Sequence, residues 1–153
     1  MQNSLHIVPS IDIHELASMN RMLLEDEGAE NPMSVAQLEE RLGGWLESGA
    51  YHAAVMHHNE EVVGYILYRE EQDAYDVSRK NIYVRQFFIK RTYRRRGIGR
   101  AAFEQVVATQ FPPGTTIVLE VLASNLQGRA FWERLGFQPY FTTYRRRPAD
   151  VKE

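Results

Sequence analysis

Two glycines and several arginines, set between an apolar and an amphipathic segment, could bind an anion through the main chain. The run is Arg94-Arg95-Arg96-Gly97-Ile98-Gly99-Arg100; residues 83–89 before it are largely apolar, and residues 100–111 after it are amphipathic. A strand that ends in such a turn and opens a helix leaves several backbone N–H groups unpaired, and the helix dipole adds positive potential. Glycine keeps Cβ atoms away from a bulky pyrophosphate, and the arginines add charge. The residues therefore predict an anion cradle for a phosphorylated cofactor.

The chain as a whole predicts a single soluble domain, residues 1–153. Its length is sufficient for one continuous core, with 44% hydrophobic and 25% charged residues. No window approaches the roughly 18 apolar residues that a membrane span requires. The N-terminus has neither the basic start nor the apolar core of a signal peptide, and the absence of cysteine excludes disulfides and thiolate chemistry. We therefore expect a cytoplasmic protein without a membrane partner.

Hydrophobic periodicity predicts the elements that position the cradle. Apolar residues at helical spacing predict helices, and alternating or β-branched runs predict strands. The sequence Ser34-Val35-Ala36-Gln37 has the form of a capping box that would start the second helix. The expected strands are 5–11, 51–57, 62–68, 81–89, 116–122 and 137–147, and the expected helices are 14–25, 34–49, 100–111 and 125–136. Hairpins in the first half and alternating strands and helices in the second predict a mixed α+β fold.

Two segments together resemble the GCN5-related N-acetyltransferase (GNAT) superfamily. The first is Arg94-x-x-Gly97-x-Gly99, and the second is Asn125-Leu126-Gln127-Gly128-Arg129-Ala130-Phe131-Trp132-Glu133-Arg134-Leu135-Gly136-Phe137. Their spacing, the helix between them and the strand at 117–121 are similar to the acetyl-CoA-binding half of that family. The resemblance implies an α+β fold with a twisted, mostly antiparallel sheet of about six or seven strands, about four flanking helices and splayed central strands.

The resemblance also implies where acetyl-CoA would bind as a cosubstrate. Main-chain amides of residues 94–100 would receive its pyrophosphate. The pantetheine arm would lie beside Phe88 and Ile89, where two neighbouring strands splay apart and leave backbone groups unpaired. Later residues expected to touch the coenzyme are Asn125, Phe131 and Trp132.

Acetyl transfer to an amine needs a base, a donor to the developing oxyanion and a proton for the leaving thiolate. The resemblance implies that the backbone N–H near Ile89 serves the oxyanion. It also implies a carboxylate base at Glu120, in a Leu-Glu-Val segment similar to that of ribosomal-protein alanine acetyltransferases. An alternative is that Glu120 is a strand residue paired with an arginine. Since no cysteine can carry an acyl group, we expect direct transfer within a ternary complex.

The proton donor is a departure from the family pattern, because Trp132 stands where many members have tyrosine. An indole N–H donates a hydrogen bond but does not release its proton at neutral pH. Tyr140, shortly after the motif, is the first candidate to replace that tyrosine. Tyr144, Tyr83 and water are the alternatives, and a purely structural role for Tyr140 remains open.

Acidic residues between the first two helices suggest how an acceptor amine would approach. Glu25 and Glu27, together with Asp26 and Glu30, would attract a cation. The alternative is that they are solvated carboxylates at a helix end. The family acts on amines as different as protein N-termini, lysine side chains and antibiotics, so the sequence leaves the acceptor open.

The sequence therefore predicts an acetyl-CoA-dependent N-acetyltransferase that acts on a primary amine of a small molecule, peptide or protein. One alternative is an inactive acetyl-CoA sensor. Another is a nucleic-acid-binding module built on residues 90–96 and 145–147, against which the net charge of −2 and the lack of a nucleic-acid motif both argue. The adjacent histidines at 57 and 58 would point to opposite faces of a strand, so we expect no metal. Because the family often forms dimers, a homodimer is compatible with the resemblance.

Overall fold

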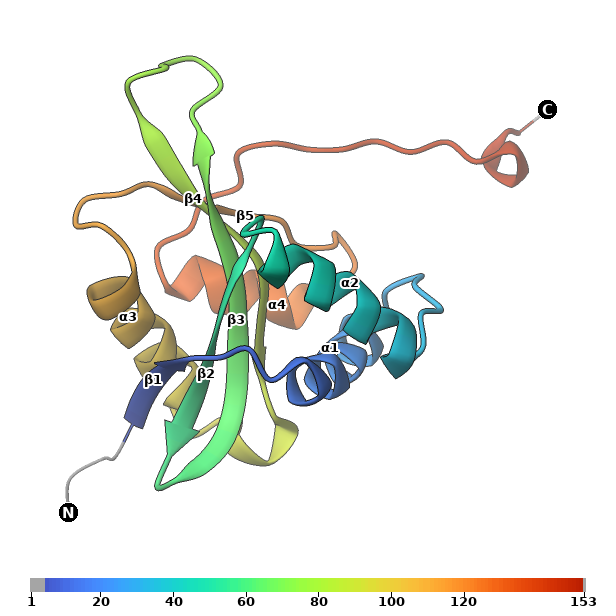
Figure 1. Ribbon diagram of the computed structural model, residues 1–153. Helices are drawn as coiled ribbons and strands as arrows, with labels where there is room; N and C mark the ends of the chain where they lie inside the picture. The colour runs from blue at the N-terminus through green and yellow to red at the C-terminus, as the bar shows by residue number, and fades with distance from the viewer. Residues whose placement is uncertain (1–4, 153) are drawn as a thin grey trace.

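The computed structural model describes residues 5–152, which form one five-stranded sheet and four α-helices (Figure 1). In chain order the elements are β1 Leu5–Pro9, α1 Ile13–Glu27, α2 Val35–Glu47, β2 His52–His58, β3 Glu61–Gln72, β4 Lys80–Ile89, α3 Ile98–Gln110, β5 Ile117–Leu119 and α4 Leu126–Arg134, with short 3₁₀ helices η1 Arg91–Tyr93 and η2 Pro148–Asp150. The mixed α+β class predicted from the sequence is confirmed.

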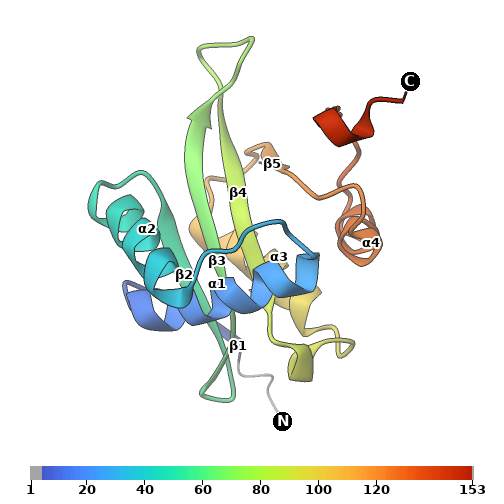
Figure 2. The ribbon, with the colours of Figure 1, turned by 90° about the vertical axis from the view of Figure 1, so that its right-hand side faces the viewer.

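The sheet has the strand order β1-β2-β3-β4-β5. The first four strands are antiparallel to their neighbours, and β5 runs parallel to β4. Helices α1 and α2 cover one face of the sheet, and α3 and α4 lie on the other (Figures 1 and 2). We refer to these as the α1/α2 face and the α3/α4 face.

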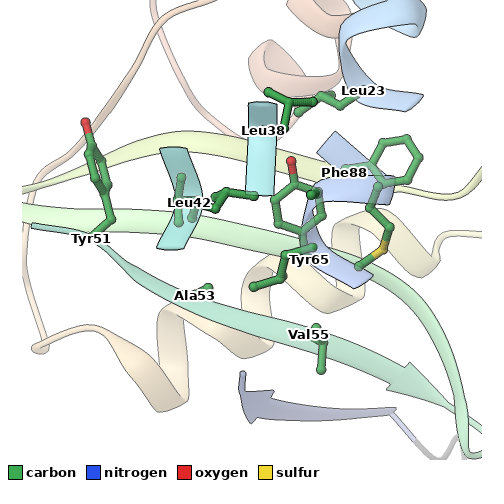
Figure 3. Packing of buried hydrophobic residues seen from close by; sticks show 12 residues of the cluster. Leu23, Leu38, Leu42, Tyr51, Ala53, Val55, Tyr65 and Phe88 are labelled. Atoms are coloured by element: carbon green, nitrogen blue, oxygen red, sulfur yellow. The ribbon is translucent and has the colours of Figure 1, made fainter. Parts of the chain in front are cut away.

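Each face of the sheet has its own core because side chains alternate along a strand. On the α1/α2 face, Tyr65 packs with Leu42 of α2 and Phe88 of β4 (Figure 3). The neighbouring Ile66 belongs to the cluster on the α3/α4 face, together with Phe103 of α3. The two cores enclose β3 and β4 between the helix pairs, and the candidate site lies at the end of β4.

Local sequence fixes the ends of the first two helices. The Asp12 side chain accepts a hydrogen bond from the backbone N–H of Glu15 at 3.1 Å, and Gly28 ends α1 in the left-handed conformation. The predicted capping box is confirmed, since the Gln37 N–H donates to Ser34 Oγ at 3.2 Å and the Ser34 N–H donates to Gln37 Oε1 at 2.8 Å. The acidic residues at the end of α1 are therefore held on a well-capped turn.

Strands β3 and β4 approach each other closely at Gly64. A Cβ atom at this position would lie only 1.9 Å from the carbonyl oxygen of Phe88. Glycine is therefore required for the pairing that places the end of β4.

A β-bulge interrupts the same strand pair nearer the start of β4. Tyr68 pairs with Val84 and Leu67 pairs with Gln86, so Arg85 has no partner on β3. A bulge changes the direction of the side chains around it. Here both Arg85 and Gln86 contact residues of the α1/α2 face.

The C-terminal part of the chain differs from the sequence prediction. β5 is shorter than the expected 116–122, and no strand forms at 137–147, so the described sheet has five strands where about six or seven were expected. A strand needs a neighbour for its backbone groups, whereas the chain after α4 runs as an extended segment away from the sheet (Figure 1). We call residues 138–152 the C-terminal arm. No residue from Pro112 to Lys152 is buried.

Within residues 5–152, no helix combines the length and the apolar character needed to cross a membrane.

Candidate active site

The predicted cradle presents unpaired backbone N–H groups. The Arg94 N–H donates to the Arg91 carbonyl at 3.1 Å, and the next amide with a backbone acceptor is that of Ala101, which donates to Gly97 at 3.1 Å. Among the described residues, the amides of 95–100 have no hydrogen-bond partner. Gly97 caps α3 with a φ of 74°, and Arg95 also has a positive φ, of 64°. These turns direct successive amides to the start of α3, as an anion site requires.

The arginines of the cradle fall into two groups. Arg95, Arg96 and Arg100 are exposed and form no ion pair with any described carboxylate. The Arg94 side chain instead turns inward, where its Nε donates to the Ile89 carbonyl at 2.8 Å and its Nη2 donates to Asp26. Arg94 therefore fixes the turn to its surroundings, and the other three arginines are free to meet an anion.

Asp26 joins the end of α1 to the cradle turn. Its carboxylate accepts from Arg91 Nη2 at 2.7 Å as well as from Arg94. Burial acts to raise the pKa of Asp26, but the hydrogen bonds and charges of the two arginines outweigh it and lower that pKa. This member of the acidic turn is already neutralised by the chain itself.

The splay between β4 and β5 implied by the family resemblance is present. The two strands pair only over residues 82–84 and 117–119. Beyond that point no backbone hydrogen bond joins residues 85–89 to residues 120–124. The chain then turns into α4, where Asn125 Oδ1 accepts from the Gly128 N–H at 3.0 Å. The N-cap predicted at Asn125 is thus confirmed.

One backbone donor of β4 points into this opening. The Lys90 N–H donates to the Val63 carbonyl of β3 at 2.8 Å. Since successive N–H groups along a strand point to opposite edges, the Ile89 N–H points away from β3 and toward the gap. This direction fits the expected donor to an oxyanion.

A cavity of about 610 Å³ lies between the C-terminal end of α1 and the N-terminal end of α4. This volume is within the range of small-molecule sites. The lining residues are Glu25, Asp26, Glu27, Gly28, Ser124, Asn125, Leu126 and Gln127. The acidic end of α1 therefore faces the helix that follows the splayed strands.

Glu27 is the carboxylate of this cavity that the chain leaves without an ion pair among the described residues. Burial, and secondly the charge of Asp26, raise the pKa of Glu27. Nearby, the buried Tyr65 hydroxyl donates to Gln86 Oε1 at 2.8 Å, and the Glu27 charge adds to burial in raising the pKa of that phenol. A partly buried, unpaired carboxylate favours an incoming cation.

The rest of the acidic turn is balanced by arginines. Glu25 lies 3.7 Å from Arg21 on the same helix, and Glu30 lies 3.3 Å from Arg145 and 3.5 Å from Arg147 of the C-terminal arm. The expected attraction for a cation therefore rests mainly on Glu27 rather than on the whole cluster.

Glu120 follows β5 and is held by a tyrosine of β4. The Tyr83 hydroxyl donates to Glu120 Oε1 at 2.7 Å. Burial, and then the hydrogen bond to Glu120, raise the pKa of Tyr83, so the phenol stays protonated. Tyr83 acts as a hydrogen-bond donor that orients the carboxylate, a contact that the sequence could not indicate.

The aromatic residues of α4 pack against the sheet and α3. The Trp132 ring has its centroid 5.4 Å from Phe87 and 5.0 Å from Phe103, and Phe131 stacks on Phe87. A Cβ atom on Gly99 would lie 3.3 Å from the Phe131 ring. These two residues thus support the start of α3 from behind.

Tyr140 lies on the C-terminal arm with 83% of its surface exposed. Neither Tyr140 nor Tyr144 lines the cavity, and neither has a polar contact among the described residues. The expected role of Tyr140 as proton donor stays a prediction.

Sequence reasoning missed a row of stacked arginines and aromatic rings on the α1/α2 face. The guanidinium carbons of Arg41 and Arg85 lie 4.7 and 4.6 Å from the Trp45 ring centroid. Arg69 lies 5.0 Å from the Tyr51 ring and 5.1 Å from the ring of Tyr83. The only local signal was the spacing of Arg41 and Trp45, four residues apart on one helix.

Among residues 5–152, no group of three or more histidine, aspartate or glutamate side chains is arranged to hold a metal ion.

Known proteins similar to this chain include acetyltransferases. The model of the acetyltransferase (GNAT) family matches residues 16–137. A possible acetyltransferase from Clostridium difficile 630 has a TM-score of 0.74 at 19% identity, covering 94% of this chain and 97% of its own. A predicted acetyltransferase from Clostridium acetobutylicum, solved with acetyl-CoA, has a TM-score of 0.73 at 16% identity, covering 97% and 99%. Aminoglycoside N-acetyltransferase AAC(6')-Iy, solved with CoA, has a TM-score of 0.72 at 13% identity, covering 96% and 97%. No curated protein sequence matches the chain.

Proposed function

The chain belongs to the acetyltransferase (GNAT) family, and we propose on this basis that it is an acetyl-CoA-dependent N-acetyltransferase acting by direct transfer to a primary amine. One observation carries the proposal. The unpaired amides of residues 95–100 and three unpaired arginines adjoin the open end of the β4–β5 pair. A doubly charged pyrophosphate needs such donors, and an amide-bearing arm can pair with the unpaired strand edge.

The residues present fit coenzyme A. The amides of residues 95–100 would hold the pyrophosphate, with Arg95, Arg96 and Arg100 around it. The strand edge at Phe88 and Ile89 would hold the pantetheine arm. Asn125, Phe131 and Trp132 would contact the coenzyme from α4; Asn125 lines the cavity, and the two rings pack against Phe87.

We propose Glu120 as the base that removes a proton from the amine. The bound thioester supplies an activated acetyl group. Glu120, oriented by Tyr83, would take a proton from the bound ammonium group so that the neutral amine can attack, and the Ile89 N–H would stabilise the developing oxyanion. The raised pKa keeps the Tyr83 phenol protonated, and Tyr140 has no polar contact among the described residues, so the leaving thiolate would receive, through water, the second proton that the nitrogen releases. No cysteine is available for an acyl-enzyme, so both substrates are bound together.

The acceptor amine would enter through the cavity beside Glu27. The carboxylate of Glu27 lacks an ion pair in the described structure and would gain one from an ammonium group. Glu25 and Glu27 were both expected at the acceptor site. Because Glu25 is paired with Arg21, Glu27 at the end of α1 is the residue that would bind the amine. The acceptor is an amine of a small molecule or of a peptide or protein.

A homodimer is part of the proposal. The C-terminal arm has no backbone hydrogen bond to the sheet, and Tyr140, Phe141 and Tyr144 are 83, 86 and 91% exposed. Unpaired strand-like segments and exposed aromatic residues favour association, and the outer edge of β5 is also unpaired among the described residues.

Two measurements test the proposed function. Acetyl-CoA at about 100 times its dissociation constant should stabilise the fold by about 2.7 kcal/mol, which a thermal shift detects. The variant Gly99→Val, whose side chain would press on Phe131 at the cradle, should lose most of this shift. Release of free thiol with a panel of amines then separates an enzyme from a sensor. Salt-sensitive binding to DNA or RNA without any response to acetyl-CoA would contradict the proposal.

A further inference from the structure

Two cations on the α1/α2 face have no counterion. Arg41 of α2 and Arg85 of β4 stack on the same Trp45 ring, and neither forms an ion pair with a described carboxylate. Their polar contacts are weak and neutral: Arg41 Nη2 donates to Asn20 Oδ1 at 3.5 Å, and Arg85 Nη1 donates to the Tyr51 hydroxyl at 3.4 Å. Arg41 is half-buried, and guanidinium groups at such positions are ordinarily paired.

Buried hydrogen-bond donors at the same place also lack acceptors. Asn20 is completely buried, and its Nδ2 has no partner; the Nε of Arg41 is likewise buried without a partner. The two groups belong to side chains in contact with each other. A buried donor without an acceptor is unfavourable. Burial, and secondly the positive charge of Arg85, also lower the pKa of Arg41. The cluster therefore lacks an acceptor that carries negative charge.

An anion satisfies this cluster better than water. A water molecule could accept from one donor but would leave two like charges unbalanced. A carboxylate accepts several hydrogen bonds and balances charge, and the planar guanidinium group matches its geometry. Access from solvent exists at Arg85, whose side chain is exposed and is turned to this face by the β-bulge. Since Asn20 Nδ2 and Arg41 Nε are themselves buried, an incoming anion would meet the other guanidinium nitrogens of the two arginines.

The cluster is connected to the proposed catalytic carboxylate. Arg85 follows Tyr83 by two positions on β4, a distance of about 7 Å along a strand. Tyr83 holds Glu120, and Arg69 stacks between the rings of Tyr51 and Tyr83. A molecule with its amine at Glu120 would therefore extend along β4 toward Arg85.

We propose that Arg41 and Arg85 bind an anionic group of the acceptor, so that the acceptor is an amine that also carries a carboxylate. This inference rests on the proposed acetyltransferase function and specifies its substrate class. Glu120 serves the amine end, and the two stacked arginines serve the carboxylate end. The carboxylate can belong to a free amino acid or to an acidic side chain near the N-terminus of a peptide.

Matched acceptors test the proposal in the thiol-release assay. One arm compares free amino acids with their carboxamides, and the other compares peptides with aspartate or asparagine at the second position. A charge-assisted bond of about 1.5–3 kcal/mol corresponds to a preference of roughly 10- to 150-fold in kcat/KM for the carboxylate form. The arm with the larger preference identifies the source of the carboxylate.

Variants assign the preference to the site. Arg85→Gln should remove it by raising the KM of the carboxylate acceptor, with little change in kcat, in the KM of the carboxamide or in the KM of acetyl-CoA. Arg85→Lys should restore part of it, because lysine keeps the charge but not the planar geometry. Arg41→Gln should act in the same direction, after its melting temperature is checked. Arg79→Gln, at an exposed position in the β3–β4 loop, is the control and should keep the wild-type preference.

Failure of this inference and failure of the proposed function give different results. Thiol release with equal kcat/KM for carboxylate and carboxamide acceptors, or a preference that survives in Arg85→Gln, would overturn the anion site alone. Absence of thiol release with every amine would overturn the acetyltransferase. In that case, calorimetric binding of the same amino acids and peptides to wild type and Arg85→Gln still decides the site, since equal affinities would refute it.

Discussion

A carboxylate that accepts a hydrogen bond from a protonated phenol is fixed in direction but keeps its second oxygen free. Glu120 is in this situation, because Tyr83 donates to Oε1 only. The free oxygen can accept a proton from an amine, directly or through water. Among single residues, the Tyr83–Glu120 pair is therefore where substitutions test the proposed chemistry most specifically.

Replacing the base should affect turnover more than coenzyme binding. We expect Glu120→Gln to lower kcat by about 10²- to 10³-fold, because general base catalysis contributes on this order. Tyr83→Phe, which only frees the carboxylate, should have a smaller effect. The measurement is thiol release at saturating substrate, with acetyl-CoA affinity as the control. An unchanged kcat in Glu120→Gln would exclude Glu120 as the base.

The partly buried Glu27 should make acceptor binding depend on pH. Its folded pKa is raised, so the protonated form is favoured in the folded protein, and ionisation destabilises the fold as pH rises from the usual pKa through the raised one. A cationic acceptor offsets this loss, so its KM should fall over the same pH range. Glu27→Gln should abolish that fall and should be more stable than wild type above the raised pKa, but not below the usual one. Titration of KM and of unfolding free energy checks both, and identical pH profiles would disprove the assignment.

The unpaired amides of the cradle could be predicted from the sequence because they belong to a single turn. The side-chain contacts around the cradle could not be predicted, since they join segments that are far apart in the sequence. Asp26 meets Arg94 across 68 positions, and Tyr83 meets Glu120 across 37. Tyr140 is close to the α4 motif in sequence and lies on the exposed arm.

At the scale of elements, the pairing of β3 with β4 positions both ends of the candidate site. Gly64 allows the close approach near Phe88, and the bulge at Arg85 turns a cation to the α1/α2 face. Neither feature follows from periodicity, which predicted the two strands but not their register. The strand expected at 137–147 shows the same limit, because an extended pattern does not reveal whether a neighbour exists.

A single methyl group at Gly64 should therefore disturb the pair. We expect Gly64→Ala to lower the free energy of unfolding by about 2 kcal/mol, because the Cβ atom would overlap the Phe88 carbonyl and the strands must separate. Gly44→Ala is the matched control, since Gly44 lies inside α2 with nothing within 4 Å of the added Cβ. It should stabilise by about 0.5–1 kcal/mol. Urea denaturation of both variants gives the comparison, and equal stabilities would contradict the close approach.

At the scale of the whole molecule, burial is unevenly distributed. The core lies in residues 16–111, and the chain beyond it has no buried residue in its described part. The fold class and the cofactor-binding half could be predicted, because they follow from patterned segments. The position of the arm could not, because its sequence is compatible with a strand in this molecule or in a second copy.

The C-terminal arm allows the proposed dimer to be tested by cysteine cross-linking, because the chain has no cysteine of its own that could form other disulfides. We expect wild type to sediment as a dimer, and a chain ending at residue 137 to sediment as a monomer with its melting temperature little changed. A mixture of Leu122→Cys and Thr143→Cys proteins should form a disulfide-linked heterodimer if the arm lies along β5 of the partner. Wild type that remains a monomer at high concentration would refute the dimer.

Asp26 connects the cavity to the cradle turn, so loss of its charge would affect both. Its carboxylate belongs to the wall of the cavity and, at the same time, accepts from the arginines of the cradle turn. Its lowered pKa means that this link is intact above the usual aspartate range and is lost as acidification reaches the lowered value. Protonation of Asp26 would then weaken the binding of the amine and of the nucleotide, so both affinities should decline in parallel in acid.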